Sequence, residues 1–167
     1  MEKITIGQAQ KLTSPNPFCL VTVQKPDGGT NVMALSWWTY VSNNPATVLI
    51  CTSNKGYTGE LIKNSGEFGL SFPGKAMVAE AMKAGKSSGR NKDKAAELGI
   101  KFIDVEGYDI RLVSGCRLGL ACRLVDSHPV GDHTIYIGEV VRSLGDERIG
   151  ALYAFGGYAE LDTVERA

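Results

Sequence analysis

Short alternating apolar runs in the second half of the chain limit the possible folds more than any other feature. Apolar residues of one parity recur in two runs, which are Leu118, Leu120, Cys122 and Leu124, and then Ile135, Ile137 and Val141. A repeat of two residues is the pattern of a strand with one buried face. Residues 128–133 lie between the runs and contain Pro129 and Gly131, so the sequence predicts a hairpin connection there.

The first half adds further strands and only short helices. Strands are predicted over residues 18–23, 30–35, 47–52 and 67–72. Helices are predicted over 59–64, with Thr58 as the N-cap, around 77–82, and over 92–98. Few parallel crossovers are evident. The sequence therefore predicts a mainly β fold with short helices (α+β), built as a closed or half-closed antiparallel barrel, with residues 1–167 as a single domain.

The net charge and the cysteine pattern limit which partners and which cellular compartment are expected. Eighteen basic residues balance eighteen acidic ones, so no excess positive charge is available for nucleic acid or an anionic membrane. No run approaches the roughly 20 apolar residues of a membrane span, and the N-terminus has no apolar export signal. Four cysteines without CxxC spacing then favour reduced, buried thiols and a cytoplasmic location.

Residues 31–42 combine hydroxyl groups with aromatic rings directly after a predicted strand. Ser36, Trp37, Trp38 and Ser42 all fall within this segment. A flat heteroaromatic ligand suits the mixture, because indole faces cover its rings while hydroxyl and backbone donors reach its polar groups. The alternative from the residues alone is that both tryptophans belong to the core or to a subunit interface.

The turn formed by residues 53–58 leads directly into a predicted helix. The backbone amides at a helix start are free and the helix dipole is positive there, so such a turn suits a phosphate group. Lys55 adds a charge and Thr58 a hydroxyl. The alternative is a capped helix with a solvated lysine, which Glu60 in the first turn favours. The polar loop 87–91 likewise either contacts a second phosphate or is simply solvated.

No motif for metal binding or covalent catalysis is visible. His128 and His133 are separated by a Pro- and Gly-containing turn and have no cluster of carboxylates or cysteines beside them, so no metal site is predicted. No phosphate-loop or dinucleotide fingerprint precedes a helix, and no serine lies in a recognised nucleophile motif.

Taken in order, these segments resemble the flavin reductase-like, FMN-binding split-barrel family, and within it the flavoredoxin-type branch. The landmarks are Pro17 with Leu20-Val21-Thr22, Asn31 and Met33 with Ser36-Trp37, Val41-Ser42 with Pro45, Thr58 with Ile62, Gly66-Glu67-Phe68, Ser88-Gly89-Arg90 with Asp93-Lys94, and Gly131-Asp132-His133 with Gly138-Glu139-Val140. The resemblance implies an FMN-binding split β-barrel with a Greek-key-like topology.

The resemblance also implies where a flavin would bind. Residues of the 31–42 segment would border the ring, mainly through backbone groups, and the 53–58 turn would hold the ribityl phosphate. Lys94 would approach the flavin or its phosphate, and His133 would lie near a stacked nicotinamide. In the family an aromatic residue often follows the Asp-Lys pair, whereas Ala95 stands there in this chain. The full expected cofactor-binding set is Asn31, Met33, Leu35, Ser36, Trp37, Trp38, Ser53, Asn54, Lys55, Thr58 and Lys94.

By the same resemblance, the expected activity is that of an NAD(P)H:FMN oxidoreductase, in which NADH or NADPH passes a hydride to FMN. The expected assembly is a homodimer that hands electrons to an oxygenase or another redox protein. Three alternatives stay open: a flavoredoxin-like FMN electron carrier that does not oxidise NAD(P)H itself, a relative of the pyridoxine phosphate oxidases, and a member that binds no cofactor.

Overall fold

Seven antiparallel strands form the main sheet of the computed structural model, which describes residues 1–164. In sheet order the strands are β3 (Thr30–Leu35), β2 (Cys19–Gln24), β6 (Glu67–Pro73), β9 (Cys116–Val130), β10 (His133–Gly145), β5 (Ala46–Ser53) and β4 (Trp38–Asn43). Residues 165–167, which the sequence assigns to the same domain, lie outside the described residues.

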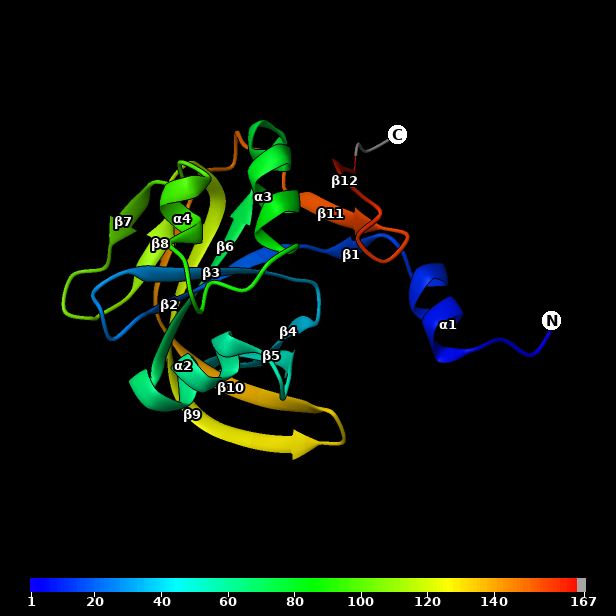
Figure 1. The fold of residues 1–167 in the computed structure, drawn as a ribbon, viewed down its shortest axis with the longest axis horizontal. Coiled ribbons are helices and arrows are strands. Elements are labelled where there is room, and N and C mark those ends of the chain that lie inside the picture. The colour runs from blue at the N-terminus through cyan, green and yellow to red at the C-terminus, as the bar shows by residue number, and fades with distance from the viewer. Residues whose placement is uncertain (165–167) are drawn as a thin grey trace.

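The link between the two outermost strands makes this sheet curl. β3 and β4 stand at opposite ends of the strand order, yet only Ser36 and Trp37 separate them in the chain. A link this short spans at most about 10 Å, so the two edges of the sheet must approach each other where β3 ends and β4 begins. Within residues 1–164 no strand pairing joins β3 to β4, and we call this open line the seam (Figure 1). The prediction of a mainly β, half-closed antiparallel barrel is confirmed.

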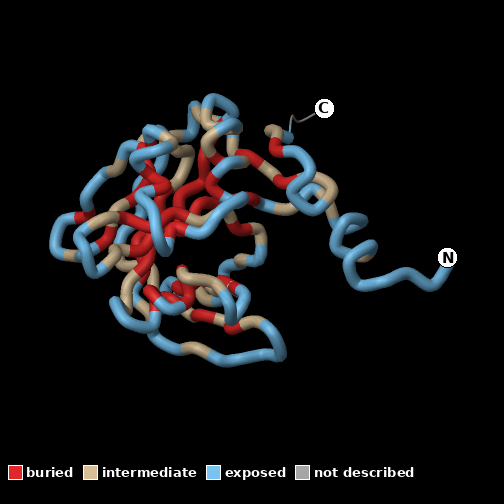
Figure 2. The backbone as a smooth tube through the Cα atoms, in the orientation of Figure 1, coloured by how far each residue is buried: buried red, intermediate tan, exposed pale blue. Residues whose placement is uncertain are grey.

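Smaller elements surround the barrel. A second sheet consists of β1 (Asn16–Pro17), β11 (Leu152–Phe155) and β12 (Glu160–Thr163), and a third of β7 (Phe102–Asp104) and β8 (Arg111–Val113). The helices are α1 (Ile6–Leu12), α2 (Tyr57–Ser65), α3 (Val78–Ala84), which follows a 3-10 turn, and α4 (Lys94–Glu97). α1 has no buried residue and extends away from the barrel (Figures 1 and 2).

Two large apolar clusters hold these elements together. One fills the barrel and includes Ile50, Phe68 and Tyr136, against which α2 packs Leu61 and Ile62. The other joins the barrel wall to α3, α4 and the small sheet through residues that include Phe18, Val32, Ala81, Ala95 and Leu152. Figure 2 shows the buried backbone gathered at the centre of the molecule. None of the helices within residues 1–164 has the length and apolarity that a membrane crossing requires.

Helix α2 begins earlier than the sequence pattern predicts. Its N-cap is Gly56, and Thr58 lies inside the first turn. The Thr58 hydroxyl is engaged elsewhere, because it accepts a hydrogen bond of 2.9 Å from Asn31 Nδ2. The prediction of Thr58 as the N-cap is therefore wrong. It fails because the Thr58 hydroxyl is bonded to Asn31, a residue far away in sequence.

The hairpin between β9 and β10 is also tighter than predicted. Residues 128–130 continue β9 and pair with β10, so only Gly131 and Asp132 turn the chain. Pro129 fits in the strand because the pairing of β9 with β6 has already ended at Arg123, which leaves no second neighbour that needs the missing N–H.

The cysteines match the predicted burial only in part. All four are free thiols, but Cys51 and Cys116 are half-buried while Cys19 and Cys122 are buried. The prediction of four buried thiols is thus correct for two of them.

Candidate functional site

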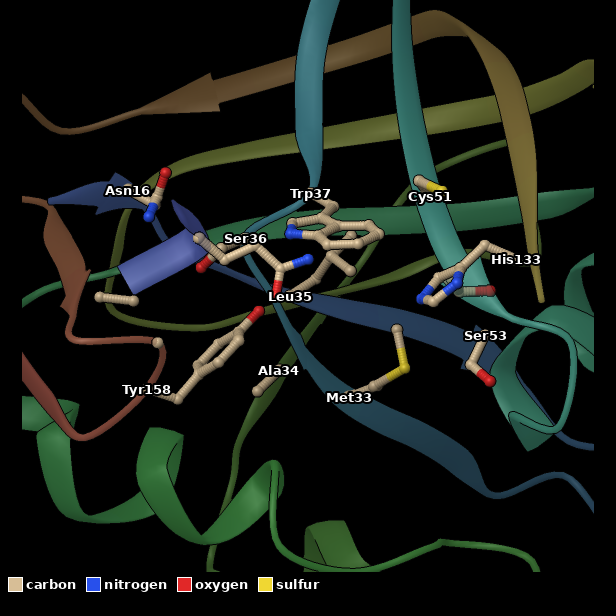
Figure 3. A pocket seen from close by; sticks show the side chains of 14 residues that line it. Asn16, Met33, Ala34, Leu35, Ser36, Trp37, Cys51, Ser53, His133 and Tyr158 are labelled. Carbon is tan, nitrogen blue, oxygen red and sulfur yellow. The ribbon is translucent and has the colours of Figure 1, made fainter. Parts of the chain in front are cut away.

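A cleft of about 350 Å³ lies at the seam of the barrel. Its walls come from parts of the chain that are distant in sequence: the end of β3 with the seam residues, the end of β5, the start of β10, and the small sheet with the segment that follows β11 (Figure 3). Of the residues expected at a ligand site, the cleft gathers Met33, Leu35, Ser36, Trp37, Ser53 and His133.

An aromatic pair forms part of the cleft wall. The rings of Trp37 and His133 have centroids 4.8 Å apart and planes inclined by 32°. Trp37 is 44% exposed, so its indole lies at the surface of the cleft rather than in the core. Met33 reaches the cleft from β3, His133 from the start of β10, and Trp37 from the link between β3 and β4 (Figure 3). The cleft is therefore lined by flat and flexible apolar groups, which suit a planar ring.

The orientation of His133 is set by its neighbour Asp132. The two side chains are 2.7 Å apart between Nδ1 and Oδ1, and this hydrogen bond lowers the pKa of Asp132. An ionised carboxylate can only accept a hydrogen bond, so the contact places a proton on Nδ1 of His133. Nε2 is then the ring nitrogen of His133 that is left for a ligand.

One polar atom in the cleft wall lacks a partner. The Ser36 hydroxyl is enclosed, yet it forms no hydrogen bond with any residue in the range 1–164. The Tyr158 hydroxyl points toward it without completing a bond of standard geometry (Figure 3). Burial raises the pKa of Tyr158, and the nearby Ser36 partly offsets that increase. A buried polar atom without a partner is unfavourable, so a ligand with a polar group at this point would be stabilised by binding Ser36.

A second cavity, of about 470 Å³, adjoins the cleft at Ser53 and lies between α2 and the β9–β10 hairpin. We call it the helix cavity. α2 begins without a side-chain cap, so the N–H groups of its first turn are available to an anion. Lys55 and Gly56 line the cavity at this helix start. A planar ligand in the cleft could therefore extend an anionic group past Ser53 to the helix.

Asn54 fixes the turn before α2 and has little capacity left for a ligand. Its Nδ2 donates to the Gly131 carbonyl at 3.0 Å, and its Oδ1 accepts from Thr134 Oγ1 at 2.7 Å. Its backbone N–H donates to the Asp132 carbonyl at 2.9 Å. Asn54 thus ties the turn to the hairpin tip and holds Ser53 and Lys55 beside the helix start.

Asn31 and Thr58, also in the expected set, line neither cavity and form a buried pair behind the helix start. Their hydrogen bond joins β3 to α2. Gly89 packs so closely against Asn31 that a Cβ at Gly89 would overlap with Asn31 Oδ1. The loop after α3 therefore contacts Asn31 directly. The bond between Asn31 and Thr58 holds α2 in position, and neither side chain faces a cavity.

Lys94 and Trp38 lie outside both cavities as well. Lys94 is buried, and its ammonium donates to the carbonyls of Ala84 and Ser87 at 2.7 Å each, which holds the loop between α3 and α4. Burial lowers the pKa of Lys94 to about 8. Trp38 packs its indole on Phe72, with centroids 4.6 Å apart, on the opposite side of the strand from the cleft.

The sequence analysis missed the cleft residues that lie near the two ends of the chain. These are Gln10, Asn16, Ala154, Gly157 and Tyr158, and Cys51 and Thr52 in β5 were missed as well. The one local signal is the pair Gly156-Gly157, which with Tyr158 adopts three successive left-handed conformations, at φ 56°, 69° and 70°. A tyrosine rarely takes this conformation, and here it turns the ring toward the cleft.

The site combines a cleft lined by aromatic side chains at the seam of the barrel with the uncapped start of α2. This combination suits a flat ligand with an anionic tail. The family model of the flavin reductase-like domain matches residues 12–162. An uncharacterized protein of Archaeoglobus fulgidus is 30% identical over 71% of this chain, and the aligned region spans 65% of that protein, slightly less than two thirds. An NADH-dependent flavin reductase of Rhodococcus sp. is 27% identical over 80% of this chain and 72% of its own length.

Among solved structures, the flavoredoxin of Desulfovibrio vulgaris (Miyazaki F) superimposes with a TM-score of 0.87 and 26% identity, covering 100% of this chain and 95% of that one. The chain belongs to the flavin reductase-like family, a family of flavin-binding split-barrel proteins. The residues present fit a flavin on three counts: the ring-lined cleft, the unpaired Ser36 hydroxyl and the uncapped start of α2.

Proposed function

We propose that this chain binds FMN with its ring in the cleft and its phosphate at the start of α2. The observation that carries the proposal is that Ser53 lines both the cleft and the helix cavity. One ligand can therefore occupy both with a flat head and an anionic tail. Met33, Leu35 and Trp37 would border the ring, and Ser53, Lys55 and the first N–H groups of α2 would bind the phosphate.

We further propose that the protein is an NAD(P)H:FMN oxidoreductase. Bound FMN would supply the hydride chemistry, and the chain would orient the two reactants and exclude water. His133 would help in this: Asp132 fixes its ring, and its Nε2 can bind a polar group of the nicotinamide. Ser36 would bind a polar group at the flavin ring. No side chain of the site needs to act as an acid or base.

The second candidate is an electron carrier that does not react with NAD(P)H. The pairing of Trp37 with His133 favours it, because two stacked rings already occupy the side of the cleft where a nicotinamide would have to lie. The similarity to a flavoredoxin supports the electron carrier. The similarity to an NADH-dependent flavin reductase supports the oxidoreductase equally well.

The expected homodimer and redox partner remain part of the proposal. β4 is an edge strand with Tyr40 and Val41 exposed, which suits contact with a second copy of the chain. A redox protein or an oxygenase would take up the electrons. Four free thiols agree with a reducing compartment such as the cytoplasm.

Flavin binding and nicotinamide reactivity can be tested on the purified full chain. Titration with FMN should quench flavin fluorescence, and Lys55→Gln should weaken binding by about tenfold, the value of one charge-assisted contact. Lys101→Gln is the matched control, because Lys101 is also an exposed lysine and lines neither cavity. Unchanged affinity in Lys55→Gln would place the phosphate elsewhere.

Anaerobic mixing of the FMN-loaded protein with NADH or NADPH separates the two candidates. Rapid loss of the flavin absorbance with either nucleotide identifies a reductase. A flavin that stays oxidised with both nucleotides, but is bleached by dithionite, identifies the carrier.

A further inference from the structure

A further cavity, of about 230 Å³, adjoins the cleft on the side of α3. We call it the side pocket. Ala34 and Tyr158 line both the cleft and the side pocket, so the two cavities meet at these side chains (Figure 3). The remaining lining residues come from α3 and the loop that follows it, from β12, and from the residue before β2, and they are Ala81, Met82, Gly85, Lys86, Leu161 and Phe18.

The side pocket has the size and the surface that one aromatic ring needs. The rings of Phe18 and Tyr158 meet edge to face at its wall, with centroids 6.2 Å apart and planes at 76°. Met82 adds a flexible thioether, which packs well against an aromatic ring. A cavity of about 150 Å³ with apolar walls is enough to bind benzene. The side pocket, at about 230 Å³, therefore holds one ring with a small substituent, but not the fused rings of a flavin.

Lys86 is the one charged residue among those that line the side pocket. Within residues 1–164 it forms no ion pair with any carboxylate. The Tyr158 hydroxyl points toward Ser36 in the cleft wall (Figure 3), so the polar end of Tyr158 belongs to the cleft. A ligand in the side pocket thus meets apolar side chains and one positive charge, which favours an anionic substituent over a neutral one.

The position of Lys86 is fixed by the loop that carries it. The buried ammonium of Lys94 donates to the carbonyls of Ala84 and Ser87, which lie on either side of Lys86 in the chain. Gly85 lets this loop approach β3, because a Cβ at Gly85 would lie only 3.1 Å from a Cβ of that strand. The loop therefore holds the backbone of Lys86 at the edge of the pocket before a ligand arrives, and a preordered site loses less entropy on binding.

We propose that the side pocket is a binding site for a small aromatic carboxylate. The ring lies against Phe18, Met82 and Tyr158, and the carboxylate accepts a hydrogen bond from the Lys86 ammonium. The volume limits the ligand to a single ring, and the charge of Lys86 selects an acid over a neutral ring of the same size. The inference goes beyond the proposed function and holds whichever ligand the cleft takes. Tyr158 contacts the acid on one side and the contents of the cleft on the other.

Methionine methyl groups report the two cavities separately. Met82 lines the side pocket, Met33 lines the cleft, and Met77, which is half-buried like the other two, lines neither. Nuclear magnetic resonance spectra of the full chain, labelled with carbon-13 at the methionine methyl groups, are recorded during titration with benzoate, first without flavin and then with saturating FMN. Met33→Gln, Met77→Gln and Met82→Gln assign the three signals. Benzoate should shift the Met82 signal most in both states and leave Met77 unmoved, whereas FMN should shift Met33.

The dissociation constant of benzoate, read from the Met82 shift, then tests the charge. Lys86→Gln should raise it by about tenfold, the value of one charge-assisted contact. The matched control Lys83→Gln should leave it unchanged, because Lys83 is also an exposed lysine but does not line the side pocket. Lys55→Gln should leave it unchanged too, which excludes the start of α2 as the place where the acid binds. Benzamide, with the same ring and no charge, should bind about tenfold more weakly than benzoate and be insensitive to Lys86→Gln.

Three results would overturn the proposed acid site. One is a Met82 signal that benzoate does not move at concentrations up to about 10 mM. Another is a shift of Met33 without Met82, or a Met82 shift that FMN abolishes, since either places the acid in the cleft. The third is Lys86→Gln protein that binds benzoate as tightly as Lys83→Gln protein does. Failure of the proposed function looks different, because FMN would then leave Met33 unmoved while benzoate still shifted Met82.

Discussion

Gly59 is the position where local helix preference and tertiary packing disagree most clearly. It lies within α2, and alanine in a helix is normally about 1 kcal/mol more favourable than glycine. A Cβ at this position would lie 2.5 Å from the Tyr136 hydroxyl oxygen and 3.2 Å from Thr52 Oγ1. Overpacking a buried site costs about 1–3 kcal/mol. We therefore expect Gly59→Ala to lower the free energy of unfolding by up to about 2 kcal/mol despite the better helix propensity.

A double-mutant cycle with Tyr136→Phe isolates the contact. Removing the hydroxyl leaves the ring carbon Cζ at 3.3 Å, which is tight but tolerable after a small shift. Tyr136→Phe alone should be nearly neutral, because the hydroxyl has no hydrogen bond to lose within the described residues. In the Gly59→Ala/Tyr136→Phe double variant, the gain in helix propensity should then restore stability to that of the unaltered chain or slightly above it. The coupling energy is expected to be about 1–3 kcal/mol.

Urea unfolding followed by far-ultraviolet circular dichroism measures all four corners of the cycle. The reasoning is refuted if Gly59→Ala is as stable as the unaltered chain. It is refuted equally if the two substitutions are additive, since the Tyr136 hydroxyl would then not lie at Gly59.

Three further outcomes follow from buried groups. Asn31→Ala should lower the free energy of unfolding by about 1–2 kcal/mol in urea denaturation, because it leaves the Thr58 hydroxyl buried without a donor. Iodoacetamide labelling mapped by mass spectrometry should modify Cys51 before Cys122, whose pKa burial raises to about 12, and saturating FMN should protect Cys51 because it lines the cleft. Burial lowers the pKa of Lys94 to about 8 in the folded chain. Between about pH 8 and 10 the unfolded chain therefore binds more protons than the folded chain does. The free energy of unfolding should rise over this range by roughly 1–3 kcal/mol. Lys94→Met should abolish that rise in denaturation curves recorded across the same pH range.

The strands could be predicted from the sequence because their signals are local. Residues 30–35 match β3 at both ends, since the turn at Asp27-Gly28-Gly29 precedes them and the chain changes direction at Ser36. The start of α2 could not be predicted in the same way. Thr58 is a good N-cap by its type, and only the bond from Asn31 on β3 explains why the helix begins at Gly56.

The sequence predicted the parts of the site that lie next to strand ends, which are the link after β3, Ser53 at the end of β5 and His133 at the start of β10. Ser36 and Trp37 reach the cleft because they form the seam itself, whereas Trp38 begins β4 and turns to the other side. Lys94 illustrates the limit of assigning a role by residue type. A lysine near an expected phosphate suggests a ligand, but burial and two carbonyl partners give Lys94 a role in holding the loop. Tyr158 lies far away in sequence, and no periodic pattern connects it to the cleft.

The seam explains why binding groups collect at this place in the barrel. Edge strands carry backbone groups that have no strand partner, and β3 and β4 bring two such edges together at Ser36 and Trp37. The Trp37 carbonyl is paired with the Cys51 N–H at 2.9 Å, which fastens the link to β5 and leaves its side chain in the cleft. A barrel closed by hydrogen bonds would offer no such edge. The choice between reductase and carrier therefore does not depend on the barrel. It depends on whether Trp37 and His133 can separate to admit a second ring, and a nicotinamide is the probe that answers this.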